Sequence, residues 1–178
     1  MQHTSFANYN CPIARSLERV GEWWSILILR DAFRGLTRFD EFQKNLAIAP
    51  NMLARRLSAL VESGLLERQL YNDRPARYEY ILTERGRDFR PVLMMLLAWG
   101  NKHFFPEGPS VVMVDDTTGA VADPIVVDRH SGRSMLEPTF KSVTLPAGSK
   151  KTMKARRRPP NSPDRGKAET RSRRKSQQ

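Results

Sequence analysis

Three long polar side chains, Asn51, Arg55 and Arg56, lie close together in the stretch PNMLARRLSALVE. Arginine can donate two hydrogen bonds to the edge of guanine, and asparagine can form two with adenine. The leucines at 53, 57 and 60 recur at three- and four-residue spacing, as on the inner side of an amphipathic helix. The stretch therefore predicts a helix that packs by its leucines and presents donors outward. Charged helix surfaces are ordinary, so the arginines taken alone would fit a solvated face better.

A second amphipathic helix, RFDEFQKNL, comes just before this stretch, and the break IAPN separates the two. Two helices joined by so short a turn form a helix-turn-helix, whose second helix can enter the major groove of DNA. Upstream, IARSLERVG and WWSILILRDAF predict two further helices, the first ended by Gly21. Gly64 is expected to end the arginine-bearing helix as a left-handed cap. The neighbouring elements thus favour nucleic-acid binding over a merely solvated face.

The segments LLERQLY and ARYEYILT alternate apolar and polar residues around the polar tip NDRP, which predicts a two-stranded hairpin. The tip offers Arg74 and Arg77 to a phosphate or a minor groove. Thr83 is expected to cap a last helix, in which Pro91 predicts either a kink or a late start near Arg90. The fold class is therefore mainly α with a small β-hairpin wing (α+β), a winged helix-turn-helix.

The chain resembles the HxlR-type winged helix-turn-helix transcriptional regulators of bacteria, which are MarR-like DNA-binding proteins. The resemblance covers nearly all of residues 11–103 and includes the Cys-Pro start, Gly-x-x-Trp, Arg-Phe-x-Glu-Phe, Met-Leu-x-x-x-Leu and Thr-Glu-x-Gly. It implies a homodimer that sets one recognition helix in each half of a palindromic operator in double-stranded DNA, with repression as the default. The DNA-binding residues expected from the residues and the resemblance together are Arg38, Asn51, Met52, Arg55, Arg56, Arg74 and Arg77.

Two departures from the family pattern bear on DNA contacts. The family usually has Gly-Lys-Trp where this chain has Gly21-Glu22-Trp23, which removes a positive charge, and Pro-Pro in the wing where this chain has Pro75-Ala76. Both changes leave the expected fold intact. Some members carry Cys pairs after the winged domain; this chain has Asp and Ser there, so we expect no metal and no cofactor.

The last helix has apolar residues on more than one side, which is more than one small domain needs. We expect a second copy of the chain to cover it, through Phe89, Val92, Leu93, Leu96, Leu97, Trp99 and Phe104. The tryptophans Trp23, Trp24 and Trp99 could line an effector pocket near this interface, which would make a small molecule a further partner. The prediction we favour places them in the core, because aromatic residues at helical spacing usually lie there.

Cys11 is the only cysteine and starts the first helix, where the helix dipole and Arg15 would favour the thiolate. The resemblance suggests a sensing role, because several members of the family sense oxidants or electrophiles through a cysteine at this place. A small buried residue beside the dimer contact is the alternative that we favour. An enzyme with Cys11 as nucleophile lacks a convincing histidine partner, since His3, His103 and His130 lie in unrelated segments, and we expect no enzymatic activity.

Composition divides the chain into a winged domain and dimerisation region over residues 1–105, a small β extension over 106–148 and a disordered basic tail over 149–178. The tail holds 12 Lys and Arg against 2 Asp and Glu, most of the net charge of +11. VVMV and PIVV predict short strands in the extension, and no internal repeat is apparent. The chain shows no membrane-spanning run and no secretion signal, so we expect a cytoplasmic protein.

The tail also keeps a second function open. It could drive nonspecific, architectural binding of nucleic acid, because each phosphate contact strengthens binding to any duplex without reading bases. The leading hypothesis remains a dimeric, sequence-specific transcriptional regulator. It is a repressor by default, and a response to redox or electrophile stress or to a small effector is left open.

Overall fold

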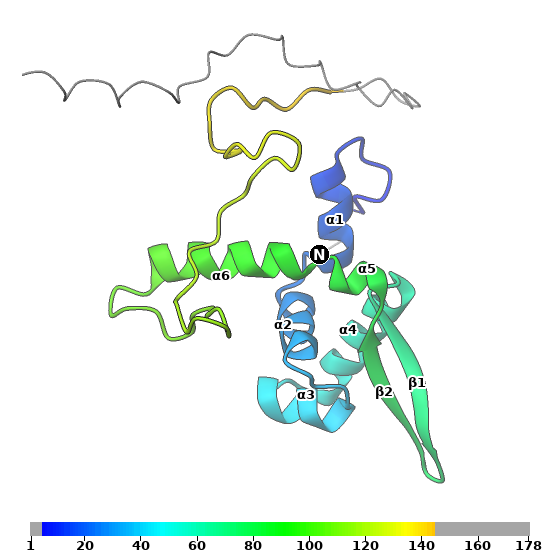
Figure 1. The fold of residues 1–178 in the computed structure, drawn as a ribbon. Coiled ribbons are helices and arrows are strands. Elements are labelled where there is room, and N and C mark those ends of the chain that lie inside the picture. Colours follow the sequence, from blue (N-terminus) through cyan, green and yellow to red (C-terminus); the bar gives the residue numbers. More distant parts are fainter. Residues whose placement is uncertain (1–4, 145–178) are drawn as a thin grey trace, which may run out of the picture. The chain divides into compact units, whose positions relative to one another are not determined.

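A computed structural model describes residues 5–144 (Figure 1). The chain divides into Met1–Glu137 and Pro138–Gln178, and the predicted basic tail lies outside the described residues. The first unit contains, in order, α1 (Pro12–Val20), α2 (Trp23–Phe33), α3 (Phe39–Leu46), α4 (Pro50–Glu62), β1 (Leu66–Asp73), β2 (Ala76–Leu82), α5 (Glu84–Arg87) and α6 (Arg90–Phe104). The predicted fold class is confirmed: a mainly helical protein with one two-stranded antiparallel hairpin. Within the described part, none of the helices combines the length and apolarity needed to cross a membrane.

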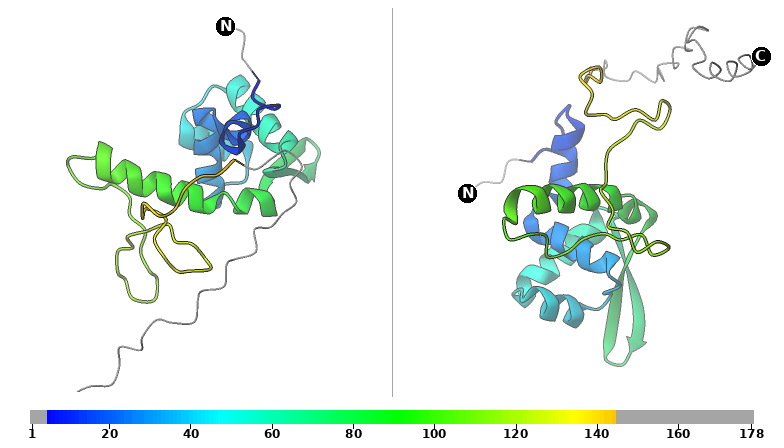
Figure 2. Two further views of the ribbon diagram at one scale, coloured as in Figure 1. Left: turned by 90° about the horizontal axis from the view of Figure 1, so that it is seen from above. Right: turned by 60° about the vertical axis from the view of Figure 1, so that its left-hand side comes forward.

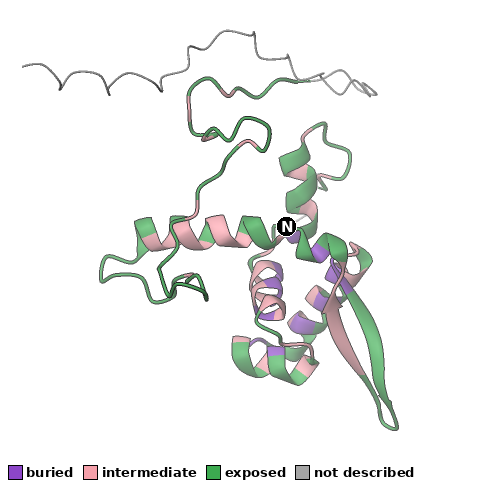
Figure 3. Cartoon of the chain, viewed as in Figure 1, coloured by how far each residue is buried: buried purple, intermediate pink, exposed green. Residues whose placement is uncertain are grey.

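The core forms where α2, α3 and α4 close on one another, and Figure 3 shows the buried residues gathered on their facing sides. Its fully buried apolar side chains are Ile28, Leu29, Phe42, Leu53, Leu57, Leu60 and, at the base of the hairpin, Leu66. Burying one such side chain stabilises the fold by about 1.5–3 kcal/mol. The predicted leucine stripe of the arginine-bearing helix is thus the inner stripe, which fixes the other side of α4 outward.

Local signals set the ends of α4. Pro50 lies in its first turn, where the missing N–H costs nothing. After the helix, Gly64 adopts φ +70°, and the Leu65 amide donates to the Leu60 carbonyl. The left-handed glycine predicted at this place is confirmed. It turns the chain directly from α4 into β1.

The hairpin projects beyond the helices as a narrow finger (Figure 1). Its strands pair from Leu66 opposite Leu82 to Asp73 opposite Ala76, with one irregularity between Leu70 and Asn72. Leu66 is buried at the base, but Leu70 is half exposed, because the finger has already left the helices at that point. Leu66 and Leu70 lie on the same face of β1, as the alternation predicts, but only Leu66 belongs to the core.

The chain passes from the wing into α6 through the short helix α5. Thr83 caps a helix as predicted, its Oγ1 accepting a hydrogen bond from the Gly86 amide at 3.0 Å, but that helix is the short α5 and not the long last helix. A side chain at Gly86 would lie 2.1 Å from the Leu65 carbonyl oxygen, so this residue lets α5 approach β1. Of the two outcomes predicted for Pro91, the late start is the one found: α6 begins at Arg90.

The expectation that the tryptophans lie in the core is wrong for two of the three. Trp23 is 74% exposed and Trp99 is 53% exposed, whereas Trp24 is partly buried and packs against the core. Trp23 is the first residue of α2, outside the region where the three core helices meet. Trp99 lies on α6, a helix in which every residue keeps some exposure (Figure 3).

The segment after α6 contains a repeat that the sequence reading missed. Single bridges join Val114 to Val121 and Val127 to Ser134, in place of the expected strands. The amide of Asp115 donates to residue 120 and that of Asp128 to residue 133, so the bridges and these backbone hydrogen bonds recur 13 positions later. Each hairpin ends in a left-handed glycine, Gly119 or Gly132. The common pattern is Val-Asp-x-x-Ser/Thr-Gly, too short for a search for long repeats to find.

Both aspartates hold these turns by side-chain hydrogen bonds. Asp115 accepts from Thr117 and Thr118, and Asp128 accepts from the amide and hydroxyl of Ser131. The hydroxyl bonds from Thr117 and Ser131 are the main reason that the pKa of each carboxyl lies below its usual range. The extension of this chain is therefore built from two equivalent turns that rest on carboxylate–hydroxyl bonds.

Candidate nucleic-acid interface

The outward face of α4 is the centre of the candidate interface. With Leu53, Leu57 and Leu60 inward, the helical period leaves Asn51, Ala54, Arg55 and Ser58 exposed on the opposite side. This face offers a guanidinium and an amide one helical turn apart, with a hydroxyl on the next turn. Ser58 was not among the predicted site residues, although its three-residue spacing from Arg55 could have identified it.

Arg56 does not share that face. Its side chain is only 16% exposed and forms an ion pair with Glu22, with 3.0 Å between Nη2 and Oε2. Its Nε is buried and has no hydrogen-bond partner among the described residues. The two adjacent arginines, predicted as equivalent base readers, therefore lie in different surroundings: Arg55 in solvent, Arg56 against the start of α2.

The turn between α3 and α4 sets the angle at which α4 is presented. Ala47 adopts a left-handed conformation with φ +48°, and Ile48 is buried in the core immediately after it. A left-handed non-glycine residue is uncommon and persists when the packing around it requires it. Met52, another predicted DNA-binding residue, is partly buried and packs against the core cluster. Its thioether is therefore only partly available to a ligand.

Arg38 joins the helix-turn-helix to the wing. Its Nε lies 3.3 Å from Oε1 of Glu79 on β2, and its guanidinium lies 4.6 Å from the ring centre of Tyr71 on β1. The hydrogen bond to Glu79 is the main reason that its pKa lies above the usual arginine range. The backbone makes the same connection, since the Tyr80 amide donates to the Thr37 carbonyl at 2.7 Å. Arg38 remains half exposed, so it can hold the wing and still face a ligand.

The wing tip carries Arg74 and Arg77, both exposed. The Asn72 side-chain amide donates to the Pro75 carbonyl at 2.9 Å and thereby ties the two sides of the tip together. Nearer the base, the Arg68 guanidinium stacks on the Tyr78 ring at 3.4 Å from its centre. The tip thus presents two cations on an ordered turn, which suits a phosphate backbone.

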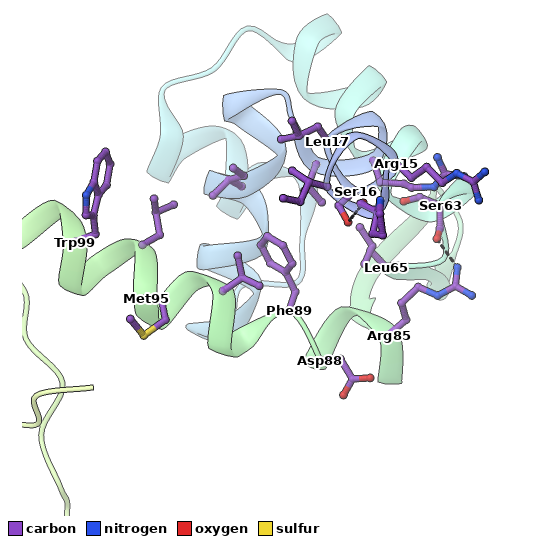
Figure 4. Close-up of a pocket in the computed structure, with 17 residues that line it drawn as sticks. Arg15, Ser16, Leu17, Ser63, Leu65, Arg85, Asp88, Phe89, Met95 and Trp99 are labelled. Carbon is purple, nitrogen blue, oxygen red and sulfur yellow. Dashed lines mark hydrogen bonds between the residues drawn. The ribbon is translucent and has the colours of Figure 1, made fainter. Parts of the chain in front are cut away.

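A separate apolar groove of about 970 Å³ runs between α1 and α6. Figure 4 shows Phe89, the residue just before α6, pointing into it, and Trp99 further along on α6. The large side chains that line it and remain half or more exposed are Ile13, Leu17, Val92 and Trp99, with Leu96 slightly less exposed.

The groove includes four of the predicted interface residues: Phe89, Val92, Leu96 and Trp99. Of the other three, Leu93 and Leu97 are partly buried, and Phe104 is exposed beyond the groove at the end of α6. The contribution of α1 was missed, though its own apolar face could have revealed it.

Cys11 lies at the start of α1 in an extended conformation and is partly exposed. Its carbonyl accepts the Arg15 amide at 3.1 Å, while the Arg15 Nε donates to the Tyr9 carbonyl at 2.7 Å. Cys11 therefore directly precedes Pro12, which lines the groove, and its helical turn includes an arginine that is already engaged with the backbone. Within residues 5–144, no three His, Cys, Asp or Glu side chains gather as metal ligands would.

Figure 2 shows the three-helix core and the wing from two further sides. Comparison with known proteins agrees with this geometry. The HTH-type transcriptional regulator Mb3122 of Mycobacterium bovis, itself uncharacterised, is 42% identical over 137 residues, which are 76% of this chain and 85% of that protein. A candidate transcription factor of Pseudomonas aeruginosa, PA1374, is 55% identical, with a TM-score of 0.58 over 79% of this chain and 96% of that one. The structure of PA1607, also a candidate transcription factor, is 38% identical with a TM-score of 0.70, over 79% of this chain and 99% of that one.

The redox regulator HypR in its reduced form is 29% identical, with a TM-score of 0.50, and covers 55% of this chain and 99% of its own. Residues 19–107, from the end of α1 to just beyond α6, match the HxlR-like helix-turn-helix family. With the shared fold, the wing and the relatives in agreement, the chain belongs to the HxlR-like helix-turn-helix family of transcriptional regulators.

Proposed function

We propose that two copies of this chain bind a palindromic operator, each with α4 in the major groove and its wing on the neighbouring backbone, and that binding represses transcription. The single observation that carries the proposal is the outward face of α4. It holds Asn51, Arg55 and Ser58 exposed on a helix fixed by three fully buried leucines. These donors suit the edges of adenine and guanine, and the wing arginines suit phosphates.

The groove between α1 and α6 supports the dimer. Exposed apolar side chains such as Ile13, Leu17, Val92 and Trp99 form a continuous lining there, and α6 buries none of its residues within one copy. Contiguous apolar surface of this kind usually marks an interface. A two-fold axis at α6 would set two copies of α4 about one DNA turn apart, ~34 Å.

The experiment that tests this function is selection of DNA fragments by the purified protein, followed by gel shifts of a selected and a scrambled duplex at physiological salt. The proposal expects a palindromic site and a specificity ratio of about 10³ or more. Equal binding of both duplexes would favour the architectural alternative. A variant lacking residues 149–178 separates the two functions further, because a nonspecific binder driven by the basic tail would lose binding while a groove-reading dimer would keep its selectivity.

A response to oxidants or electrophiles through Cys11 is the regulatory part of the proposal. It is supported by the partial exposure of Cys11, the residue before the groove-lining Pro12, and by the similarity to a redox regulator. With one cysteine in the chain, a disulfide would join two copies or bind a small thiol. Repeating the gel shift with oxidant on wild type and Cys11→Ser tests it. Equal behaviour of the two proteins would exclude a role for this cysteine.

A further inference from the structure

Arg56 and Glu22 join the DNA-presenting helix to the junction of α1 and α2. Among the ion pairs between described residues, theirs is the one that ties α4 to another element. We propose that this pair sets the rotation of α4 about its own axis, so that Arg56 is a positioning residue and Arg55 is the residue that reads DNA. The proposal rests on the function proposed above and assigns different roles to two adjacent arginines.

The two arginines point in different directions because successive helical residues are about 100° apart around the axis. Arg55 follows the exposed face, whereas Arg56 lies at the edge between that face and the leucine stripe. Leucine packing alone holds a helix face inward but tolerates a small roll. The Arg56–Glu22 ion pair at the edge adds a second contact with its own geometry, and it resists roll in the direction that would carry Arg55 away from its ligand.

Glu22 is suited to be the fixed end of this contact. It immediately precedes α2, where its carboxylate lies near the positive end of the helix dipole, and its carbonyl accepts the Ser25 amide at 2.9 Å. Gly21, the residue before it, lets the chain turn closely against the end of α1, since a side chain there would lie 2.4 Å from the Leu17 carbonyl oxygen. The carboxylate thus comes from a short, sterically defined junction.

Arg56 has little left to offer a base. Its side chain is mostly buried, its Nη2 is paired with Glu22, and its Nε has no hydrogen-bond partner among the described residues. If Arg56 left Glu22 to contact DNA, the Glu22 carboxylate would remain unpaired beside the approaching phosphates. The pair therefore serves DNA binding through the position of α4 and not through direct contact.

Glu22→Gln provides a sharp test because two mechanisms predict opposite signs. If Glu22 acted only as a charge near DNA, its neutralisation would tighten binding to every duplex. If it positions α4, the variant loses affinity for the selected operator by about 5- to 150-fold, the worth of one bidentate base contact, while binding to a scrambled duplex stays the same or tightens slightly. Arg56→Gln should show the same loss on the operator.

The exchange Glu22→Arg with Arg56→Glu restores an ion pair with reversed polarity. It should return operator affinity to within about threefold of wild type, whereas no change at position 22 should rescue Arg55→Ala. Glu137→Gln, which breaks the Arg133–Glu137 ion pair after α6, is the matched control and should leave binding unchanged. A failure of the exchange, with thermal unfolding like that of wild type, would show that Arg56 contacts DNA itself and would overturn the positioning role.

The failure of the proposed function would look different. Wild type would then show no preference for any duplex, before any variant is measured. The pair remains testable in that case by NMR, because the Arg56 Nε–H signal should shift in Glu22→Gln together with the amides of residues 51–56, and should be unchanged in Glu137→Gln. An Arg56 Nε–H signal that is unchanged in Glu22→Gln would overturn the proposal independently of DNA.

Discussion

The buried carboxylate of Asp31 accepts a hydrogen bond from the side-chain amide of Asn45, with 2.7 Å between Oδ2 and Nδ2. Its other oxygen lies 2.9 Å from the Arg30 guanidinium and 3.8 Å from that of Arg34. Asp31 is fully buried, and its carbonyl also accepts the amides of Arg34 and Leu36 in the turn after α2. One residue thus joins the end of α2 to α3, the first helix of the helix-turn-helix.

Replacing Asp31 by alanine should therefore destabilise the fold. The change leaves Arg30 and Asn45 without their partner, at a cost of about 2–3 kcal/mol; this is below the range for a fully buried pair because Arg30 is more than a third exposed. Urea unfolding measures it. Asp40→Ala, on the exposed side of α3, is the control and should cost less than about 1 kcal/mol. Equal losses in the two variants would mean that burial of Asp31 contributes nothing.

Glu41 should make part of the stability depend on pH. The backbone amides of Arg38 and Thr37 both donate to Oε2 at 2.9 Å and hold the pKa of the Glu41 carboxyl below its usual range. A lowered folded-state pKa stabilises the fold above the unfolded pKa, about 4.3, and this share is lost as pH falls through the folded value. Glu41→Gln keeps the capping contact but removes the charge.

Wild type should thus exceed Glu41→Gln in stability at about pH 6, and the difference should shrink as the pH falls through the lowered pKa of the Glu41 carboxyl. Chemical unfolding across this range measures the two curves. The same substitution at Glu62, exposed at the end of α4, serves as control and should leave the shape of the wild-type curve unchanged. A Glu41→Gln curve parallel to wild type at every pH would contradict the role given to the carboxylate.

The two hairpins after α6 should respond to acid in the same way, because they are equivalent. The hydroxyl bonds from Thr117 and Ser131 lower the pKa of Asp115 and Asp128, so both carboxyls should titrate below about 3.9 by NMR. Asp128→Ala removes the side-chain bonds that hold the second turn, so it should reduce the protection of the Gly132 amide against hydrogen exchange and leave that of the Gly119 amide intact. Simultaneous loss at both glycines would show that the hairpins are one cooperative unit and not two.

Sequence patterns predicted the fold closely because its signals are local. Helix periodicity, the left-handed Gly64 and the Thr83 cap each act within a few residues. The roles of Arg55 and Arg56 could not be separated in this way, since the partner of Arg56 is Glu22, far away along the chain. Periodicity places both arginines outside the leucine stripe, and only the packing of α1 and α2 against α4 decides which of them meets solvent.

The tryptophans show the opposite limitation. Apolar spacing marks a face that needs cover, but it does not say whether the cover comes from the same chain. Trp99 follows the apolar pattern of α6 and is nevertheless half exposed, because the groove that it lines is open in one copy. The same pattern in α1 leaves Ile13 and Leu17 exposed across the groove. A pattern that predicts burial therefore does not say whether the same chain or, as in the proposed dimer, a second copy supplies the cover.

Leu96→Glu should convert the proposed dimer to a monomer. Leu96 lines the groove and is 43% exposed in one copy, so a carboxylate there is tolerated by the monomer but would be buried unpaired at an interface. Light scattering after size exclusion measures the mass, and operator affinity should fall with it. Leu136→Glu, at an exposed leucine after the second hairpin, should leave the mass unchanged. A dimeric Leu96→Glu protein would place the interface elsewhere.

Arg77→Ala should weaken DNA binding without changing its selectivity. Arg77 is exposed at the wing tip, on a turn ordered by the Asn72–Pro75 hydrogen bond, and is suited to a phosphate. Removing one phosphate contact lowers the affinity for operator and scrambled duplexes by the same factor and reduces the slope of log K against log salt by about 1. Arg55→Ala should differ on both counts, because a base contact worth about 1–3 kcal/mol is lost only on the operator. Titrations of both variants on both duplexes at several salt concentrations therefore distinguish the proposed backbone contact of the wing from the proposed base contact of α4. An Arg77→Ala loss confined to the operator would assign base reading to the wing.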